Sequence, residues 1–413
     1  MKRIVLLSIL LSAFSSIAET RFPIIGWSSI PASQISVERY AEMRDAGFTH
    51  SLSHFSSLAE VLRALNAAQE ADIKIIAACP ELKTDTKGTV KALKNHPAMG
   101  SYSLRDEPSA KDFAELAAWV KRIQSVDTVH PCYINLYPNN ANQRELGTET
   151  YAEHIRLFAE TVYLPIYSFD HYPVLTLEPP KAFPWRVDGK LCRYNPLWYE
   201  NLELFSAEMR RRNKPFWAFA LATSHINPPI GHYPVPTTGF MKLQQYSNLA
   251  YGAQGLQYFT YWTPHFGKPM YFHDGPINGK RKRSPVFDRV REVNHELQAR
   301  AFVFLGAKVQ EIRHTGTEIP PGTKRLDKLP SFVTTLKTPD GGAVVSHLIN
   351  GETEYLVVVN RELGREITLH ATFVPGVKRI RKDGSAVDVA AYASDFWLEA
   401  GDAEIFAFSK GTK

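Results

Sequence analysis

The sequence has few cysteines and no metal-binding pattern. Only three cysteines occur among 413 residues, and this low number excludes a disulfide framework of the kind that holds small secreted domains together. Their spacing matches no zinc motif, and no compact cluster of histidines and acids has the spacing of metal ligands. The sequence therefore predicts neither a structural disulfide network nor a metal site.

The sequence also lacks features that phosphate-binding proteins need. The net charge is only +6 for 413 residues, and no basic stripe could follow a nucleic-acid backbone. The segment "GWSSIPA" (26–32) follows the first predicted strand and has no glycine-rich turn for a nucleotide phosphate. We therefore expect no nucleic-acid partner and no cofactor.

One apolar stretch stands out, at the N-terminus. Residues 1–20 read "MKRIVLLSILLSAFSSIAET", with two basic residues, an apolar run, and small residues at Ser16 and Ala18. This order is typical of a secretory signal peptide that is cleaved after Ala18. The run is short for a membrane anchor, and no other stretch is long enough to cross a bilayer. We expect residues 1–18 to be removed and the protein to be secreted or periplasmic, with no membrane span.

Between residues 22 and 300, short apolar runs alternate with amphipathic stretches. Eight strand-like runs, each followed by a helix-like stretch, predict a (β/α)8 barrel over residues 19–301. The predicted strands are 22–27, 48–55, 73–81, 99–108, 130–138, 162–174, 214–225 and 254–262.

The pattern changes after residue 301. Residues 302–413 contain short runs of period-2 alternation, separated by turns such as "PDGG" and "KDGS". These runs predict an antiparallel β-sandwich domain. The segment "LEAGDAEIFAF" (398–408) is expected to form its final hairpin.

The ends of the predicted barrel strands carry the candidate site, because active sites of such barrels lie at the carboxyl ends of the strands. The fourth strand ends at Asp106 and Glu107, and the sixth ends at Asp170. Paired acids together with aromatic faces suit a sugar, whose rings stack on aromatics and whose glycosidic bond is cleaved by two carboxylates. The residues that we expect to bind the carbohydrate are Trp27, His54, Asn135, Tyr137, His171, Tyr172, His225, Tyr261 and Trp262.

Three motifs carry a family resemblance: "SLRDEP" (103–108), "SFDHYP" (168–173) and "NLAYGAQGLQYFTYW" (248–262). With them, the chain resembles secreted bacterial glycoside hydrolases of the (β/α)8-barrel superfamily that carry a "DEP" and a C-terminal β-sandwich. The resemblance implies that Glu107 is the acid/base, with Asp106 where that superfamily usually has an asparagine. Its nucleophile is a glutamate at the end of the seventh strand, but "WAFALATSH" (217–225) contains no acid.

Three explanations for the absent acid stay open. Asp170 on the sixth strand can be the second carboxylate. Alternatively, Asp106 and Glu107 can serve a substrate-assisted, hexosaminidase-like hydrolysis, in which the 2-acetamido group of the sugar is the nucleophile. Finally, the barrel can bind carbohydrate without turnover.

Structural roles compete with each catalytic one. Asp106 and Glu107 suit a helix N-terminus, and Asp170 suits a turn before Pro173. We favour a hydrolase of an oligo- or polysaccharide in which Glu107 protonates the leaving oxygen and Asp170 is nucleophile or base. Burial and nearby negative charge must then raise the pKa of Glu107, and Asp106 helps to raise it.

Overall fold

A computed structural model describes residues 21–177, 191–228, 231–265, 270–389 and 395–409. The predicted signal peptide, residues 1–18, lies outside these residues. Among the helices of the described part, none has the length and apolar character required to cross a membrane.

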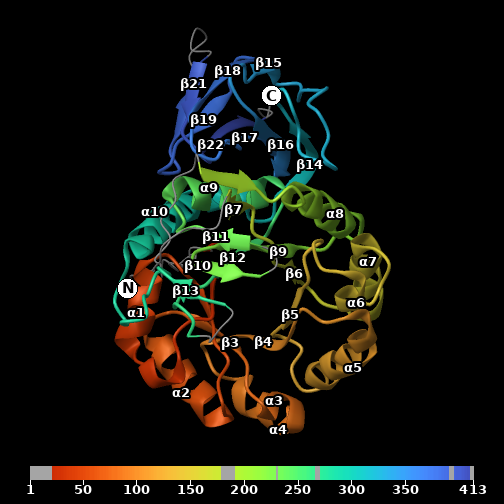
Figure 1. Cartoon of the computed structure of the whole chain (residues 1–413), viewed down its shortest axis with the longest axis vertical. Coiled ribbons are helices and arrows are strands. Elements are labelled where there is room, and N and C mark those ends of the chain that lie inside the picture. Colours follow the sequence, from red (N-terminus) through yellow and green to blue (C-terminus); the bar gives the residue numbers. More distant parts are fainter. Residues whose placement is uncertain (1–20, 178–190, 229–230, 266–269, 390–394, 410–413) are drawn as a thin grey trace, which may run out of the picture.

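Eight parallel strands close into a barrel, which confirms the predicted fold class (Figure 1). Around the ring the order is β1-β12-β9-β6-β5-β4-β3-β2, so each barrel strand pairs with its neighbours in the sequence and the last pairs with the first. The barrel strands are β1 (Ile24–Trp27), β2 (His50–Leu52), β3 (Lys74–Ala77), β4 (Met99–Asp106), β5 (Cys132–Leu136), β6 (Tyr167–Phe169), β9 (Phe216–Leu221) and β12 (Gly255–Phe259).

Helices surround the barrel because each connection has an apolar stripe and a defined start. In α2 (Leu58–Glu70), the Ser57 side chain accepts a hydrogen bond from the Glu60 N–H, and the buried residues recur at three- and four-residue spacing. The other helices are α1 (Val37–Asp45), α3 (Glu81–Thr84), α4 (Thr86–Leu93), α5 (Phe113–Gln124), α6 (Gln143–Leu146), α7 (Tyr151–Thr161), α8 (Trp198–Arg211), α9 (Thr238–Ala250), α10 (Pro285–Ala299) and α11 (Ala301–Phe304).

Period-2 alternation divides each barrel strand between two layers. On β1, Ile25 and Trp27 join the cluster inside the barrel, whereas Ile24 belongs to the layer under the helices. On β5, Tyr133 faces inward and Ile134 outward. A polar residue at an inward position is therefore enclosed by the barrel itself.

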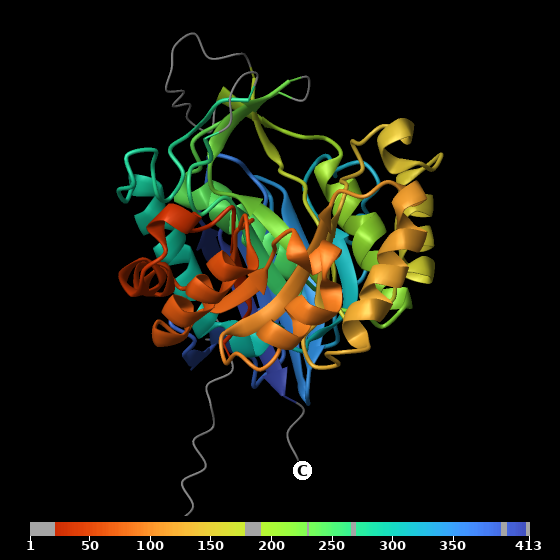
Figure 2. The ribbon, with the colours of Figure 1, turned by 90° about the horizontal axis from the view of Figure 1, so that it is seen from below.

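Two small sheets stand at one end of the barrel, and the sequence did not predict them (Figure 2). The expected seventh strand, 214–225, ends at Leu221, and the chain then enters β10 (Ser224–Asn227), which pairs with β11 (Gly231–Tyr233) and β13 (Phe272–His273). After the sixth barrel strand, β7 (Val174–Thr176) pairs with β8 (Cys192–Tyr194). Because the apolar run 214–225 has no glycine or proline at the bend, its sequence gave no sign of the break.

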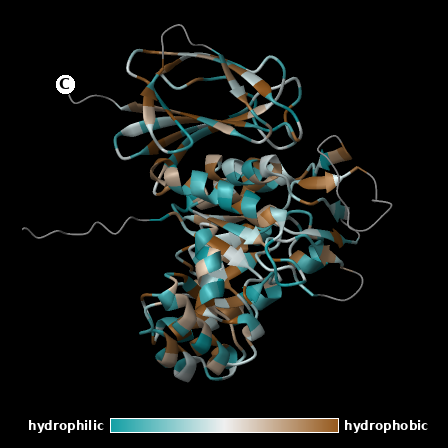
Figure 3. Cartoon of the chain, turned by 90° about the vertical axis from the view of Figure 1, so that its left-hand side faces the viewer, coloured by the Kyte–Doolittle hydropathy of each residue, from teal (hydrophilic) through white to brown (hydrophobic). Residues whose placement is uncertain are grey.

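The C-terminal part consists of two antiparallel sheets that enclose their own apolar cluster. Hydrophobic and hydrophilic residues are mixed along their strands (Figure 3). The larger sheet has the order β14-β16-β17-β22-β19-β20 and the smaller β15-β18-β21. Their strands are β14 (Lys308–His314), β15 (Val333–Lys337), β16 (Ala343–Asn350), β17 (Thr353–Asn360), β18 (Ile367–Phe373), β19 (Lys378–Ile380), β20 (Ala386–Asp388), β21 (Asp395–Leu398) and β22 (Ala403–Ser409).

The predicted final hairpin is wrong. Strand β21 pairs with β18 in the smaller sheet, whereas β22 pairs with β17 in the larger one. The turn between them therefore carries the chain from one sheet to the other, because both faces of the apolar cluster need covering.

Charged residues join the barrel to the larger C-terminal sheet, against which α9 packs. Lys242 on α9 contacts Glu296 on α10 at 2.8 Å and Asp402 at 3.8 Å. Arg300 donates to the backbone carbonyls of Arg381 at 3.0 Å and Ile380 at 3.3 Å. Lys242, Glu296, Arg300 and Asp402 thus all have polar partners, as buried charges require.

Candidate active site

A bulge in β4 turns Asp106 into the barrel. The pairing of β4 with β5 shifts between Ser103 and Arg105, so that Asp106 lies opposite Asn135. A bulge inserts one residue and reverses which side chains face inward beyond it. Asp106 therefore projects to the same side as Asn135, at the carboxyl end of the strand.

Glu107 follows in a left-handed backbone conformation, with φ of 47°. This conformation costs a non-glycine residue roughly 1–3 kcal/mol and is concentrated at functional sites. Its N–H donates to the Asn135 carbonyl at 2.8 Å. In a continued strand Glu107 would face away from Asp106; the left-handed turn ends that alternation, and the charges of both Asp106 and Asp170 reach the Glu107 carboxyl.

Asn135 connects the acids of two strands. Its Nδ2 donates to Asp106 Oδ1 at 3.1 Å and to Asp170 Oδ1 at 2.8 Å. Because both oxygens bond to the same nitrogen, the distance between them is at most the sum of these two hydrogen-bond lengths. Asn135 is only 2% exposed, so its amide has little freedom to move. It therefore holds both acids close together at the carboxyl ends of the barrel strands.

The Asp170 carboxylate has the partners of an ionised group. It accepts a hydrogen bond from Asn135 at 2.8 Å, which acts to lower its pKa, and its own backbone N–H and the Tyr172 hydroxyl act in the same direction. Burial and the charge of Asp106 act against them and raise its pKa to about 7. Burial likewise raises the pKa of Asp106, while Asn135 and Arg105 act to lower it.

Glu107 keeps its proton at neutral pH. Burial is the largest cause that raises its pKa to about 9, followed by the charges of Asp170, Asp106 and Glu145. The site thus combines a protonated carboxyl with a neighbouring carboxylate that is held by donors, and this difference separates an acid from a nucleophile or base.

Aromatic residues surround these acids. Trp27 contacts the ring of His54 at 5.6 Å between centroids, and His54 is exposed. Burial and the charge of Glu107 raise the pKa of Tyr137. Tyr172, beside Asp170, packs edge-on against Tyr233 at 5.9 Å.

His225 continues this aromatic set. Its ring stacks on Tyr233 at 4.5 Å and on Phe272 at 4.8 Å, within the small sheet of β10, β11 and β13. Of the expected binding residues, Asn135, Tyr137 and Tyr172 therefore interact with the acids, whereas Trp27, His54 and His225 belong to the aromatic residues that pack around this set.

Three expected binding residues lie elsewhere. His171 is buried one position after Asp170, so it faces outward, and its Nε2 is 2.8 Å from Asn195 Nδ2. Tyr261 is 0% exposed and packs against Phe48 in the layer under the helices. Trp262 lies beneath the guanidinium of Arg39, 5.4 Å from the ring centroid. None of the contacts that the described residues make with His171, Tyr261 or Trp262 involves the acids.

Polar residues inside the barrel were missed by sequence reasoning. Ser168, Gln257 and Tyr133 face inward and bond one another and Asn135. A signal was present, since "YSF" (167–169) and "GLQYF" (255–259) each place one polar residue within an otherwise apolar or aromatic strand.

The segment after the seventh barrel strand supplies no carboxylate. Its Ser224 belongs to a serine–histidine–aspartate arrangement whose other two members follow the eighth barrel strand: Ser224 Oγ lies 3.1 Å from His273 Nε2, and His273 Nδ1 lies 2.9 Å from Asp274 Oδ2. The Ser224 side chain is 0% exposed, and its hydroxyl donates to the Tyr233 carbonyl at 2.7 Å. A serine in this state is not an available nucleophile.

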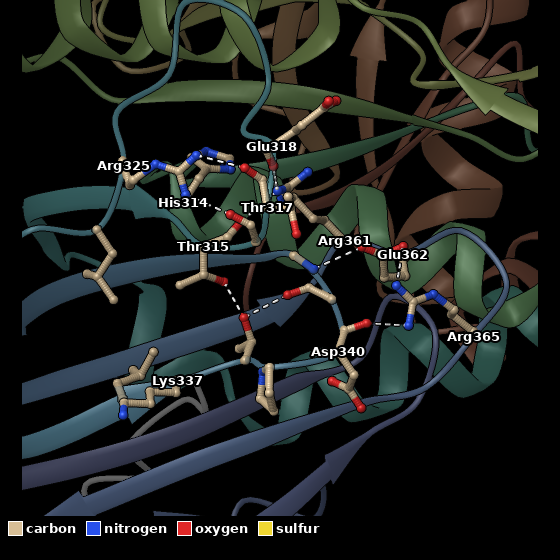
Figure 4. Close-up of a pocket in the computed structure, with 17 residues that line it drawn as sticks. His314, Thr315, Thr317, Glu318, Arg325, Lys337, Asp340, Arg361, Glu362 and Arg365 are labelled. Atoms are coloured by element: carbon tan, nitrogen blue, oxygen red, sulfur yellow. Dashed lines mark hydrogen bonds and ion pairs between the residues drawn. The ribbon is translucent and has the colours of Figure 1, made fainter.

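A pocket of about 740 Å³ lies in the C-terminal sheets, away from these acids (Figure 4). Its arginines hold the adjacent loop: Arg361 donates to the carbonyls of Thr315 and Glu318, both at 2.6 Å, and Arg325 donates to that of Thr317 at 3.0 Å. Within the described ranges, no group of three histidine, cysteine, aspartate or glutamate side chains could hold a metal ion.

Comparisons with known proteins address the same barrel. A sequence model of glycoside hydrolase family 42, described as β-galactosidase, matches residues 143–300. This range contains β6, β9 and β12 with Asp170 and Gln257, but not β4 with Asp106 and Glu107. No curated protein is detectably similar in sequence.

Solved structures share the architecture over almost the whole chain. A catalytic mutant of a GH42 β-galactosidase from G. stearothermophilus gives a TM-score of 0.59 at 9% identity, covering 95% of this chain and 99% of that one. A β-galactosidase from Bacillus circulans sp. alkalophilus gives 0.59 at 10% identity, with 94% and 99% covered. A β-galactosidase from Halorubrum lacusprofundi gives 0.50 at 9%, with 94% and 99% covered.

At identities of 9% and 10%, these structures show a shared fold. The family model covers residues 143–300, less than half of the chain, and supports an activity on O-glycosyl bonds.

Proposed function

We propose that the protein is a retaining glycoside hydrolase in which Glu107 is the acid/base and Asp170 the nucleophile. One observation carries the proposal: Asn135 donates to Asp106 and Asp170 at 3.1 and 2.8 Å, beside Glu107, whose pKa is raised to about 9. This arrangement pairs a charged nucleophile with a protonated acid.

The steps follow from these protonation states. The Asp170 carboxylate attacks the anomeric carbon, the glycosidic C–O bond breaks, and the Glu107 proton moves to the leaving oxygen. Water then attacks the same carbon while the Glu107 carboxylate takes its proton, and Asp170 leaves as a carboxylate. The charge of Asp170 raises the pKa of Glu107 more than that of Asp106 does, as expected of a nucleophile that keeps its acid partner protonated.

We propose a β-galactoside as the substrate, because the matched family model and the similar structures are of β-galactosidases. The aromatic residues around the acids supply faces on which a sugar ring can stack. We further propose that the enzyme is secreted or periplasmic, as the N-terminal sequence suggests, and that it acts on an oligo- or polysaccharide outside the cytoplasm.

A second candidate is substrate-assisted hydrolysis of 2-acetamido sugars. It is favoured by the adjacent acids Asp106 and Glu107, and by the lack of an acid where the seventh strand ends. In this mechanism Asp106 would orient the acetamido group and Glu107 would protonate the leaving oxygen.

The test uses p-nitrophenyl β-D-galactopyranoside, the matching 2-acetamido glycosides and a panel of other aryl glycosides. Hydrolysis of the galactoside, with a first-formed β-anomer in the proton NMR spectrum, supports the proposal. Hydrolysis of 2-acetamido sugars alone supports the second candidate. Binding of the panel sugars by calorimetry without any turnover would identify a carbohydrate-binding barrel and overturn both.

A further inference from the structure

A chain of hydrogen bonds crosses the interior of the barrel. The Trp27 indole N–H donates to the Tyr133 hydroxyl at 3.2 Å, and that hydroxyl donates to Gln257 Oε1 at 2.7 Å. Gln257 Nε2 donates to Ser168 Oγ at 2.8 Å, and the Ser168 hydroxyl donates to Asn135 Oδ1 at 2.8 Å. The chain thus connects β1, β5, β12 and β6.

Asn135 ends this chain at the two acids, through its Nδ2 bonds to Asp106 and Asp170. Ser168 is 1% exposed and Gln257 is 0% exposed. Bulk water therefore does not compete for these groups, and each link depends on the next.

The two ends of the chain fix its direction. An indole N–H can only donate, and an ionised carboxylate can only accept. Every group between them, whether hydroxyl or amide, can act either way. With Trp27 at one end and the carboxylates at the other, each link donates toward the acids, and the Asn135 amide then presents its NH2 to them and its oxygen to Ser168.

We propose that Ser168 and Gln257 are positioning residues, which orient the Asn135 amide so that it donates to both Asp106 and Asp170. This inference rests on the proposed function for its kinetic consequences but not for the hydrogen-bond orientation itself. Without the Ser168 hydroxyl, Asn135 Oδ1 loses its donor and the amide is free to turn, which would direct its oxygen at the carboxylates.

Other charged or titratable groups act on the same acids. Phenols with pKa values raised by burial stay neutral through the working range, so the charges of the carboxyl groups Asp106, Asp170, Glu107 and Glu145 set the local field together with that of Arg105. The groups that face the acids are Arg105 on β4, Tyr133 on β5, Tyr137 after β5, Glu145 on α6, Tyr151 on α7, Tyr172 after β6 and Tyr233 on β11.

The test compares Ser168→Ala with Ser101→Ala. Ser101 is also a buried serine of a barrel strand, on β4, but its Oγ has no hydrogen-bond partner among the described residues. For Ser168→Ala we expect kcat for p-nitrophenyl β-D-galactopyranoside to fall about tenfold with KM little changed. The acidic limb of the pH profile should move up by about one unit, because the ionised Asp170 loses an aligned donor. Ser101→Ala should match the wild type.

A second measurement is independent of turnover. The 13Cγ signals of Asp106 and Asp170, assigned with Asp106→Asn and Asp170→Asn, are titrated in aspartate-labelled protein. The pKa of Asp170 should be higher in Ser168→Ala than in the wild type or Ser101→Ala. If the wild type cleaves no glycoside, the proposed function fails, yet this titration still decides whether the chain orients Asn135.

Gln257→Leu interrupts the same chain one link earlier. It should shift the acidic limb of the pH profile in the same direction. The double variant Ser168→Ala/Gln257→Leu should lose little more kcat than the more damaging single variant, because both substitutions interrupt the same chain of hydrogen bonds. Equal Asp170 titrations in wild type and Ser168→Ala, or additive losses in the double variant, would overturn the proposal.

Discussion

Replacing Asp106 by asparagine should move the whole pH–activity profile of the enzyme to lower pH. Turnover requires Asp170 without its proton and Glu107 with its proton, so the profile is expected to be a bell. Its acidic limb reflects the pKa of Asp170, about 7, and its basic limb that of Glu107, about 9.

The charge of Asp106 raises both pKa values. Two charges about 6 Å apart, at an effective dielectric constant of about 20, interact by about 2.8 kcal/mol, which corresponds to about two pKa units. Because Asp170 raises the pKa of Glu107 more than Asp106 does, we expect Asp106→Asn to lower the basic limb by about one to two units. The acidic limb should fall as well, since the same charge is removed from beside Asp170.

The assay is kcat/KM for an aryl glycoside from pH 4 to about 10, a range that spans both pKa values. Glu145→Gln provides a graded control. Glutamine preserves the capping box of α6, and Glu145 is the weakest of the charges that act on Glu107. It should lower the basic limb only slightly and leave the acidic limb in place. A basic limb that stays near pH 9 in Asp106→Asn would refute the electrostatic account of Glu107.

Three further outcomes are expected. Glu107→Gln removes the transferable proton and should cost about 10²- to 10⁴-fold, least for aryl glycosides with the best leaving groups; a uniform loss across leaving groups would contradict an acid role. Asp170→Asn should abolish turnover but retain sugar binding by calorimetry, and azide should rescue Asp170→Ala with inverted product; near-normal turnover would reject the nucleophile. Lys242→Met leaves two buried carboxylates without this cation and should lower the free energy of unfolding by about 3 kcal/mol, measured by chemical denaturation, whereas an unchanged midpoint would show that the junction contributes nothing.

The barrel could be predicted because its signal is repeated eight times and depends only on periodicity. The ends of its strands were less predictable. The bulge between Ser103 and Arg105 decides that Asp106 faces inward, and no residue in "SYSLRDEP" announces it. The left-handed backbone conformation of Glu107 could not be predicted either, since glycine usually occupies that conformation.

Some placements could have been inferred more closely. Alternation along β6 puts Ser168, Asp170 and Tyr172 on one side and His171 on the other, and His171 is indeed turned away from the acids. Glu81, which the third strand was expected to carry, instead begins α3 and accepts from the Leu58 N–H at 3.0 Å. The residues that fix Asn135 come from several strands. Alternation along a strand predicts which side of the sheet each residue faces, but it does not predict which of them lie within hydrogen-bonding distance.

The junction between α9, α10 and the larger sheet has a consequence for the order of folding. Arg300 belongs to the last part of the barrel, yet its guanidinium is satisfied by carbonyls of residues 380 and 381, and Lys242 reaches Asp402. Until those late-synthesised residues arrive, Lys242 and Arg300 share Glu296 as their carboxylate partner and lack the acceptors that the C-terminal strands supply. We expect the barrel to reach its final stability only after β22 has been synthesised. The last strands of the chain would then complete the folding of the barrel that precedes them in the sequence.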